Sequence, residues 1–231
     1  LVGLSSFFFL LSSFFFLLSS FFILLFSYFH HHLKFRIQNL KLSMKSLVIL
    51  TGAGISAESG ISTFRDANGL WEGHDVMQVA TPEGFRRNPD LVLEFYNQRR
   101  RQLHTVKSNV GHTTLAQMEK DFTIHIVTQN VDNLHEIAGS SNVLHLHGEL
   151  LKVRSTKDPN YIVEWPGDLQ IGDYDPDGNQ LRPHIVWFGE EVPALELAVE
   201  WVQKADAVVI IGTSMQVYPE IGRASCRERV S

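Results

Sequence analysis

A glycine-rich segment that follows a short apolar run is the clearest chemical signal in the sequence. Residues 47–50 read as a strand, and Gly52, Gly54 and Ala57 after it fit the loose G-x-G-x-x-G/A pattern of dinucleotide-binding turns. At such a turn, backbone N–H groups can approach a diphosphate at the positive end of a helix dipole. The segment predicts a nucleotide site. Taken alone, the pattern also fits a glycine turn that binds nothing.

Several further motifs follow in a fixed order. They are TQNVDNLH at 128–135, HLHGE at 145–149, VWFGE at 186–190 and GTS at 212–214. With the glycine segment, their order and spacing resemble the sirtuins, the NAD-dependent protein-lysine deacylases. The resemblance extends over residues 44–218. Within the family, TPEGF at 81–85 and FYNQRRR at 95–101 are most similar to the bacterial class that also removes acidic acyl groups.

The resemblance implies His147 and Asn130 as catalytic residues. Breaking the nicotinamide–ribose bond builds positive charge on the sugar, so the site must exclude water and present the acyl-lysine oxygen on the opposite face. In the family this attack gives an alkylimidate intermediate. An imidazole that titrates near neutral pH suits the next step, deprotonation of a ribose hydroxyl. For the other histidines near these motifs we expect structural roles; they are His104, His112, His125, His135 and His145.

NAD is the cofactor that the resemblance implies. Gln129, Asn130 and Asp132 carry amide and carboxylate groups that can bind a carboxamide and sugar hydroxyls, although Asn130 and Asp132 could instead cap the following helix. Phe64 would shield the reactive sugar, and Arg65 would face phosphate. The predicted cofactor-binding set is Gly52, Ala53, Gly54, Ile55, Ala57, Phe64, Arg65, Gln129, Asn130, Val131, Asp132, Gly212, Thr213 and Ser214.

The predicted substrate-binding residues are Tyr96, Arg99, Val186, Phe188 and Gly189. The segment from Val186 resembles the strand on which an acyl-lysine peptide pairs through its backbone. Tyr96 and Arg99 share one helix face and match the pair that reads a distal carboxylate in desuccinylating relatives. An ordinary amphipathic helix with solvated arginines is the alternative. The expected reaction removes acetyl, succinyl or malonyl groups from protein lysines and yields nicotinamide, O-acyl-ADP-ribose and free lysine.

No metal site is predicted. Most sirtuins hold a structural zinc ion with two cysteine pairs, but Ser155 and Thr156 stand in place of the first pair, and hydroxyls do not replace thiolates in a closed zinc site. Residues 173–178 imitate the opening of a calcium loop, yet the twelfth position is His184 rather than glutamate. We expect a solvated turn there. Burial would then hold the surrounding module together, through Tyr161, Ile162, Trp165 and Leu181.

The elements that position these residues alternate between strands and helices. Strands are predicted at 47–50, 123–128, 143–145, 184–188 and 207–211, and helices from 57 onward and at 90–104, 111–120 and 193–204. This alternation predicts an α/β fold, a Rossmann-like parallel sheet with helices on both faces. Residues 151–182 lack such periodicity and are expected to form a small inserted module without the zinc cysteines.

Composition agrees with an enzyme of the cytoplasm. The chain has 231 residues, a formal net charge of −5 and a pI near 6.1, and so lacks the basic field that attracts nucleic acid. Its single cysteine, Cys226, excludes an internal disulfide framework. Such usage suits a reducing compartment.

The two ends stand apart from the family pattern. Residues 1–43 are low in complexity and hydrophobic, and we interpret them as non-native sequence. A membrane anchor is the alternative, because the apolar run reaches the roughly 20 residues that span a bilayer. Residues 44–222 are expected to be the catalytic domain, incomplete at its C-terminus, and 223–231 a tail outside the family.

Two other functions remain open on the sequence. A non-catalytic protein that binds NAD or acyl-lysine would keep Gly54 and Val186 without turnover. An NAD-dependent protein ADP-ribosyltransferase would use the same cofactor site with another acceptor.

Overall fold

The computed structural model describes residues 45–61, 70–71 and 73–214. The predicted leader at 1–43, the tail at 223–231, and the predicted cofactor residues Phe64 and Arg65 lie outside the described residues. Within the described part, every helix is too short or too polar to cross a bilayer.

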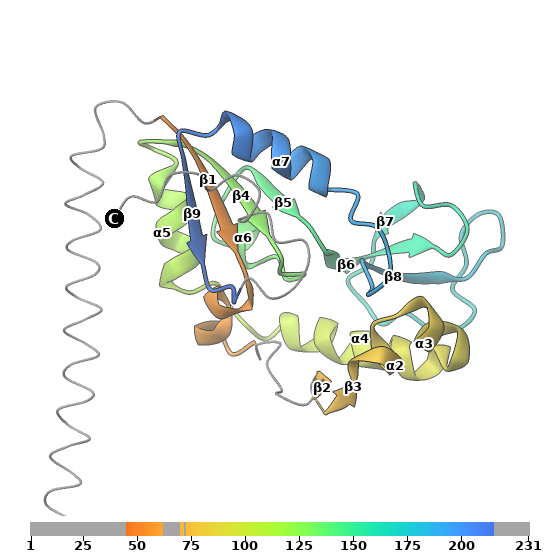
Figure 1. The fold of residues 1–231 in the computed structure, drawn as a ribbon. Helices are drawn as coiled ribbons and strands as arrows, with labels where there is room; N and C mark the ends of the chain where they lie inside the picture. The colour runs from red at the N-terminus through yellow and green to blue at the C-terminus, as the bar shows by residue number, and fades with distance from the viewer. Residues whose placement is uncertain (1–44, 62–69, 72, 215–231) are drawn as a thin grey trace, which may run out of the picture. The chain divides into compact units, whose positions relative to one another are not determined.

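Four parallel strands form the main sheet, in the order β5-β4-β1-β9 (Figure 1). Strand β1 (Ser46–Thr51) lies between β4 (Thr123–Thr128) and β9 (Ala207–Ile211), and β5 (Val143–His145) flanks β4. The inner strands β1 and β4 are rich in buried aliphatic residues, as is usual for a sheet covered on both faces. The prediction of a parallel Rossmann-like sheet is confirmed.

The register of the sheet brings the carboxyl ends of all its strands to one edge. Thr51 pairs with Thr128 on one side and with Ile211 on the other, and Thr128 pairs with His145. Ligands of open parallel sheets bind outside the carboxyl ends of the strands. The turns that follow β1, β4, β5 and β9 therefore meet where such a site is expected.

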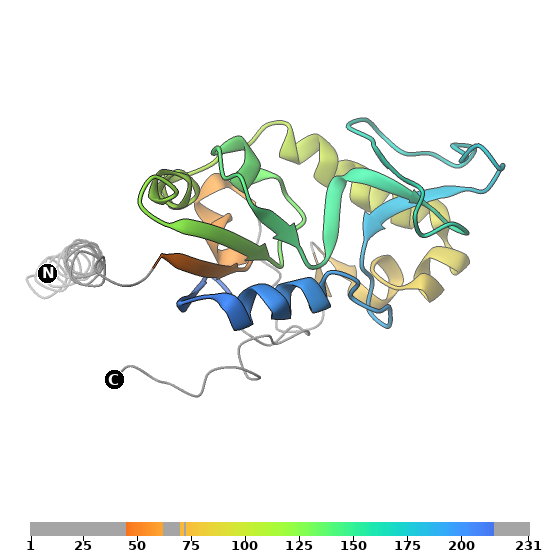
Figure 2. The same ribbon diagram turned by 90° about the horizontal axis from the view of Figure 1, so that it is seen from above.

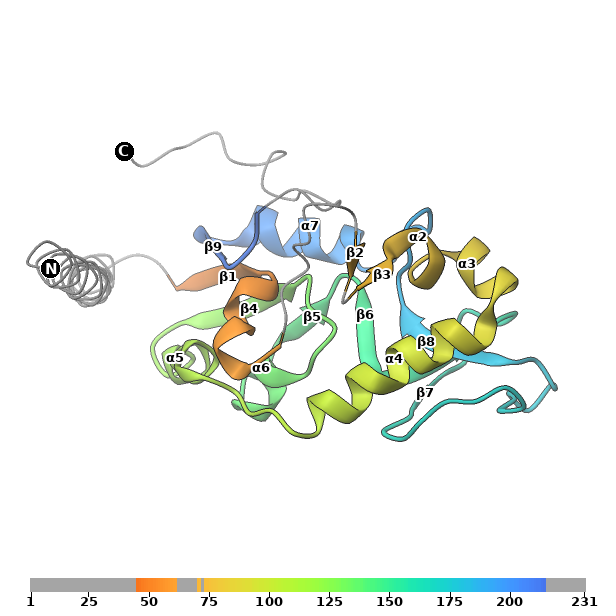
Figure 3. The same ribbon diagram turned by 90° about the horizontal axis from the view of Figure 1, so that it is seen from below.

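Helices cover both faces of this sheet. Helix α7 (Leu195–Lys204) lies on one side, and α5 (Val110–Met118) and α6 (Leu134–Ile137) lie on the other (Figures 2 and 3). On the α7 side, Ala198 and Val202 pack into the same cluster as buried residues of β1 and β4. The predicted helices at 111–120 and 193–204 correspond to α5 and α7, and α6 was not predicted.

The predicted helix from residue 57 is wrong. The chain instead makes two short 3₁₀ turns, η1 (Ala53–Ile55) and η2 (Ala57–Ser59). Their hydrogen bonds join residues three apart, as from the Gly60 N–H to the Ala57 carbonyl. Gly60 then takes the left-handed conformation, with φ of 90°, and ends the second turn.

Two short helices precede the long helix predicted at 90–104. That helix is confirmed as α4 (Pro89–Leu103), and it follows α2 (Val76–Val79) and α3 (Pro82–Arg87). Thr81 accepts a hydrogen bond from the Gly84 N–H, and proline follows this cap at the first position of the helix. The local sequence thus specifies α3, although it is too short for helical periodicity to reveal. Before α2, strands β2 (Leu70–Trp71) and β3 (His74–Asp75) pair antiparallel.

The inserted module is an antiparallel sheet in the order β7-β6-β8. It consists of β6 (Gly148–Ser155), β7 (Ile162–Glu164) and β8 (Leu181–Ile185). The predicted strand at 184–188 is therefore wrong in its bounds and in its sheet. Strand β8 ends at Ile185, and beyond it the Glu190 carboxylate accepts a hydrogen bond from the Trp187 N–H.

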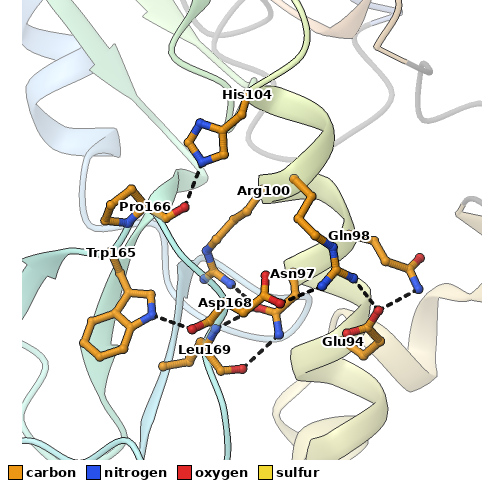
Figure 4. Close-up of polar contacts among 10 residues, drawn as sticks. Glu94, Asn97, Gln98, Arg100, His104, Trp165, Pro166, Asp168 and Leu169 are labelled. Carbon is orange, nitrogen blue, oxygen red and sulfur yellow. Dashed lines mark hydrogen bonds and ion pairs between the residues drawn. The ribbon is translucent and has the colours of Figure 1, made fainter.

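Helix α4 runs alongside this small sheet (Figure 3) and is bound to the loop that follows β7 (Figure 4). The Asn97 side chain donates to the Leu169 carbonyl and accepts from the Leu169 N–H, both at 2.9 Å, as a neighbouring strand would. Arg101 pairs with Asp168, and the His104 ring lies 2.7 Å from the Pro166 carbonyl. The loop thus gains its polar partners from one face of α4.

Apolar packing joins the module to the same helix. Leu93 of α4 clusters with Val153, Leu169 and Leu181, and Tyr161 and Trp165 pack around them. The predicted burial is confirmed for Leu181, and Tyr161 and Trp165 are partly buried. Ile162 differs, since 41% of its surface is exposed.

Ser155, which the sequence resemblance places at a position of the zinc cysteines, belongs to a buried hydrogen-bond network. Its hydroxyl donates to Asp175 at 2.5 Å, and the other carboxylate oxygen accepts from the Asp177 and Asn179 N–H groups. The bond from Ser155 holds the pKa of Asp175 below its ordinary value. Across the described ranges, no three histidine, cysteine, aspartate or glutamate side chains are grouped to hold a metal ion. The absence of zinc stays a prediction.

Asn97→Ala should destabilise the protein, because it leaves both backbone groups of Leu169 and the guanidinium of Arg100 without this partner. We expect a loss of about 2–4 kcal/mol in the free energy of unfolding, measured by urea denaturation. The control is Gln98→Ala on the exposed side of α4, which should change it by less than about 0.5 kcal/mol. Equal effects of the two substitutions would contradict this role.

Candidate functional site

The glycine segment and the turn after β9 pack directly against each other. The Gly52 N–H donates to the Ile211 carbonyl at 3.0 Å, and the Gly54 N–H to the Gly212 carbonyl at 2.8 Å. A Cβ atom on Gly54 would lie 2.8 Å from the Gly212 backbone, closer than a real Cβ atom comes. The close backbone packing thus requires the glycine pattern here. The N–H groups of Gly52 and Gly54 are already engaged within the protein.

Polar side chains from three different turns meet at this edge. The Thr213 hydroxyl donates to the Gln129 side chain at 2.7 Å, and the Gln129 N–H donates to the Thr51 carbonyl at 2.9 Å. Asn130 is held from two sides. Its N–H donates to the Thr128 hydroxyl and its side-chain amide donates to Ser56, each at 3.0 Å.

Ser56 is the centre of the cluster, and the sequence prediction missed it. Its hydroxyl accepts from Asn130 and donates to Asp132 at 3.0 Å. Burial raises the pKa of Asp132, opposed by the bonds from Leu134 and Ser56. The second oxygen of Asp132 accepts from the Leu134 N–H, but the N-cap position of α6 is Asn133, so Asp132 lies one residue before the cap. Ser56 could have been found as the one hydroxyl between Gly52 and Ala57 of the glycine pattern.

Two buried histidines lie beneath this cluster. The His112 Nδ1 atom accepts from the Asn109 N–H, so in the neutral ring Nε2 carries the proton and faces the Ser56 hydroxyl at 3.4 Å. The rings of His112 and His135 are in edge contact, with centroids 4.8 Å apart, and His135 lies 3.0 Å from the Thr51 hydroxyl. Burial lowers the pKa of both histidines, that of His135 to about 4. Both are structural in the sense expected from the sequence, yet His112 also contacts a site residue.

His147 lies next to the cluster, where β5 leads into β6. Its Nδ1 atom is 3.0 Å from the Gln129 carbonyl, which can only accept, so Nδ1 is the protonated nitrogen. In the neutral ring Nε2 then carries the lone pair. The His147 carbonyl accepts from the Val186 N–H at 2.9 Å and thereby connects the histidine to the predicted peptide segment.

The predicted peptide segment extends beyond β8. The Phe188 N–H donates to the Ala80 carbonyl at 2.9 Å, while 42% of the Phe188 surface is exposed and Gly189 lies in an exposed turn. Trp187, which precedes Phe188, is buried and donates from its indole to the Tyr96 hydroxyl at 3.0 Å. This contact joins α4 to the predicted peptide segment.

Tyr96 and Arg99 have different surroundings on α4. Tyr96 is fully buried, and burial raises the pKa of its phenol well above the ordinary value. Arg99 is partly exposed; its guanidinium donates to the Phe95 carbonyl at 2.5 Å and lies over the Phe95 ring.

The structure brings most of the predicted cofactor residues to one edge of the sheet. The remaining ones are placed around the cluster: Ala53, buried Ile55 and exposed Ala57 in η1 and η2, half-buried Val131 after Asn130, and exposed Ser214 after Thr213. Phe64 and Arg65 stay predictions because they are not described. Chemically, the edge offers amide, hydroxyl and carboxylate groups beside an imidazole whose tautomer is set.

Gly54→Ala should lower the free energy of unfolding by about 1–3 kcal/mol, because the new methyl group overlaps the Gly212 backbone and forces the two turns apart. Gly167→Ala is the matched control, since a Cβ there meets no atom within 4 Å. Denaturant unfolding of both variants measures the difference. A Gly54 variant as stable as the Gly167 variant would contradict the close packing.

Comparisons with known proteins agree on one family. The model of the Sir2 family matches residues 52–219. An NAD-dependent protein deacylase of Helicobacter pylori (strain ATCC 700392 / 26695) is 64% identical over 176 residues, which cover 76% of this chain and 77% of that protein. An NAD-dependent protein deacylase of Bacteroides thetaiotaomicron is 61% identical over 185 residues, with 78% and 79% covered.

Solved structures give the same result. A Sir2 homologue in complex with NAD superposes with a TM-score of 0.72 at 39% identity, covering 80% of this chain and 75% of that one. A Sir2 mutant solved with a p53 peptide and NAD has a TM-score of 0.65 at 29% identity, covering 80% and 78%.

Proposed function

The chain belongs to the Sir2 family, and from this membership we propose that it is an NAD-dependent protein-lysine deacylase. The observation that carries the proposal is the cluster at the sheet edge, where Ser56 orients Asn130 and Asp132 beside His147. The relatives with the highest identity given above are named as deacylases of this kind.

The residues present fit NAD. The amide and carboxylate groups of Gln129, Asn130 and Asp132 match the hydrogen-bonding needs of sugar hydroxyls and a carboxamide. Thr213 and Ser214 follow a strand at its carboxyl end, where phosphates bind in such sheets. When bound, NAD supplies a ribose carbon whose bond to nicotinamide can be broken.

The chain's own residues prepare the site for this chemistry. The Gln129 carbonyl keeps the proton of His147 on Nδ1, so that Nε2 can accept a proton from a ribose hydroxyl. Ser56 and Thr128 hold the Asn130 amide in one orientation before any ligand binds, which lowers the cost of arranging it during reaction.

His147→Ala should slow formation of the free-lysine peptide by about 10²–10⁴-fold, because the general base for the step after nicotinamide loss is missing. The measurement is formation of the free-lysine product from an acetyl-lysine peptide in the presence of NAD. His104→Ala is the control, since that histidine lies at the end of α4 and contacts Pro166. Both proteins should unfold at similar temperatures.

Other results would favour another function. NAD binding without nicotinamide release in the wild-type protein would support a non-catalytic binding protein. Label transferred from NAD to protein would identify an ADP-ribosyltransferase. A His147 variant with the wild-type rate would contradict the role of this histidine.

For the acyl group, we propose that the enzyme removes acidic acyl groups, succinyl and malonyl, as well as acetyl. Arg99 offers a cation at a partly exposed position on α4, and a guanidinium can pair with a distal carboxylate through two hydrogen bonds. Tyr96 keeps its proton because of its raised pKa, and its hydroxyl accepts from the Trp187 indole, which fixes the position of the phenol on α4.

Arg99→Met should lower kcat/KM for a succinyl-lysine peptide at least about tenfold and leave the acetyl-lysine peptide nearly unchanged, because only the first carries a carboxylate. Arg101→Met is the matched control, since that exposed arginine pairs with Glu94 and Asp168. Equal losses with both peptides would show that Arg99 supports the fold rather than the acyl choice.

A further inference from the structure

Two histidines at alternate positions hold two successive carbonyls of the catalytic turn. The His147 Nδ1 atom lies 3.0 Å from the Gln129 carbonyl, and the His145 Nδ1 atom lies 2.8 Å from the Asn130 carbonyl. Buried Leu146 between them donates from its N–H to the Thr128 carbonyl at 2.9 Å. Residues 145–147 therefore fix the backbone of the segment that carries Asn130.

His145 differs from His147 in the partner of its second nitrogen. Its Nε2 atom lies 2.9 Å from a carboxylate oxygen of Glu136 in α6. A backbone carbonyl and a carboxylate can only accept hydrogen bonds, and a neutral imidazole has a single N–H. In the neutral ring, the nitrogen without a proton would thus be an acceptor that faces a second acceptor. Only the imidazolium satisfies both.

The surroundings of His145 favour this charged form. Its side chain is only 6% exposed, and burial opposes the charge, but the bond and charge of Glu136, the Asn130 carbonyl and the charge of Glu149 raise the pKa of His145 above 6.5. Burial by itself raises the pKa of Glu136, but the hydrogen bond and charge of His145 oppose it, and the pKa of Glu136 is lowered. Asp132 faces the ring as a further acidic group, and His135 is neutral at physiological pH, its pKa being about 4.

We propose that His145 is a positioning residue that acts as a buried imidazolium, bridging Glu136 to the Asn130 backbone and so holding the catalytic turn in place. The inference rests on the proposed deacylase function, and it gives His145 a role beyond the structural one expected from the sequence. Asn130 would then be fixed at its side chain by Ser56 and at its carbonyl by His145.

The proposal implies a dependence on pH. A group whose pKa is raised by folding adds stability that is present below its unfolded pKa, about 6.5 for histidine, and is lost as the pH rises through the folded value. Deprotonation of His145 would remove one of its two hydrogen bonds and loosen the Asn130 turn. Turnover should therefore decline on the alkaline side as His145 loses its proton.

The charge state can be read directly by NMR on the full chain labelled with ¹⁵N at histidine. Two-bond ¹H–¹⁵N correlations distinguish a doubly protonated ring from either neutral tautomer, and His145→Gln assigns the signal. We expect His145 to carry both protons at neutral pH and to lose one at lower pH in Glu136→Gln than in the wild type. A single-proton ring at neutral pH, or the same titration in Glu136→Gln, would overturn the proposal.

Kinetics test the positioning role. kcat and KM for nicotinamide release are measured against pH for the wild type, His145→Gln, Glu136→Gln and His104→Gln. We expect kcat to fall roughly tenfold or more in His145→Gln, because displacement of catalytic groups slows a reaction by such factors. In Glu136→Gln, the decline of kcat on the alkaline side should move to lower pH. His104→Gln makes the same change at a histidine that also contacts a backbone carbonyl, that of Pro166, and should match the wild type.

The two arms separate failure of the inference from failure of the proposed function. An unchanged kcat in His145→Gln, or an unshifted alkaline decline in Glu136→Gln, would overturn the positioning role while the enzyme remains a deacylase. If the wild type releases no nicotinamide, the deacylase function fails, and with it the role in catalysis. The NMR titration would still decide whether the ring is charged. Should His145→Gln not fold, Glu136→Gln carries the comparison.

Discussion

The parallel pairing of β1 between β4 and β9 is the constraint on which the site depends. This pairing sets Thr51 beside Thr128 and Ile211, so the turns that follow all begin at one edge. Backbone groups of Gly52 and Gly54 continue the hydrogen bonding past the end of the strand. Buried backbone groups need such partners. The direct contact of the two turns is possible only without side chains at the glycines.

A single hydroxyl then links the turns chemically. A serine hydroxyl can donate one hydrogen bond and accept two, and Ser56 faces Asp132, Asn130 and His112, which can fill all three. Because the cluster is buried, an unpaired polar group there would be costly, while a satisfied network is strengthened by the low local dielectric. The side chain of Asn130 is thereby oriented by the protein itself.

The histidines around the site show how neighbours decide the role of one residue type. Burial without an acidic partner in hydrogen-bond contact keeps His112 and His135 neutral and lowers the pKa of each. The His145 side chain is also largely buried, at 6% exposed, yet a carboxylate and a carbonyl face its two nitrogens, and its pKa is raised. The Gln129 carbonyl places the proton of the neutral His147 ring on Nδ1. Desolvation and specific partners act in opposite directions on these rings.

The sequence by itself determined the family, the parallel sheet and most residues at its carboxyl edge, because motif spacing and runs of β-branched residues are local properties of the chain. Strands β4, β5 and β9 were predicted within their observed bounds for this reason. Only the tertiary structure decided that the segment from Ala53 forms 3₁₀ turns, that β8 joins the small sheet, and that Ser56 and His145 contact Asn130. Those outcomes depend on partners far away in the chain, such as Asp132, which lies 76 residues from Ser56. The periodicity of apolar residues in the sequence does not indicate which buried donor will face which acceptor.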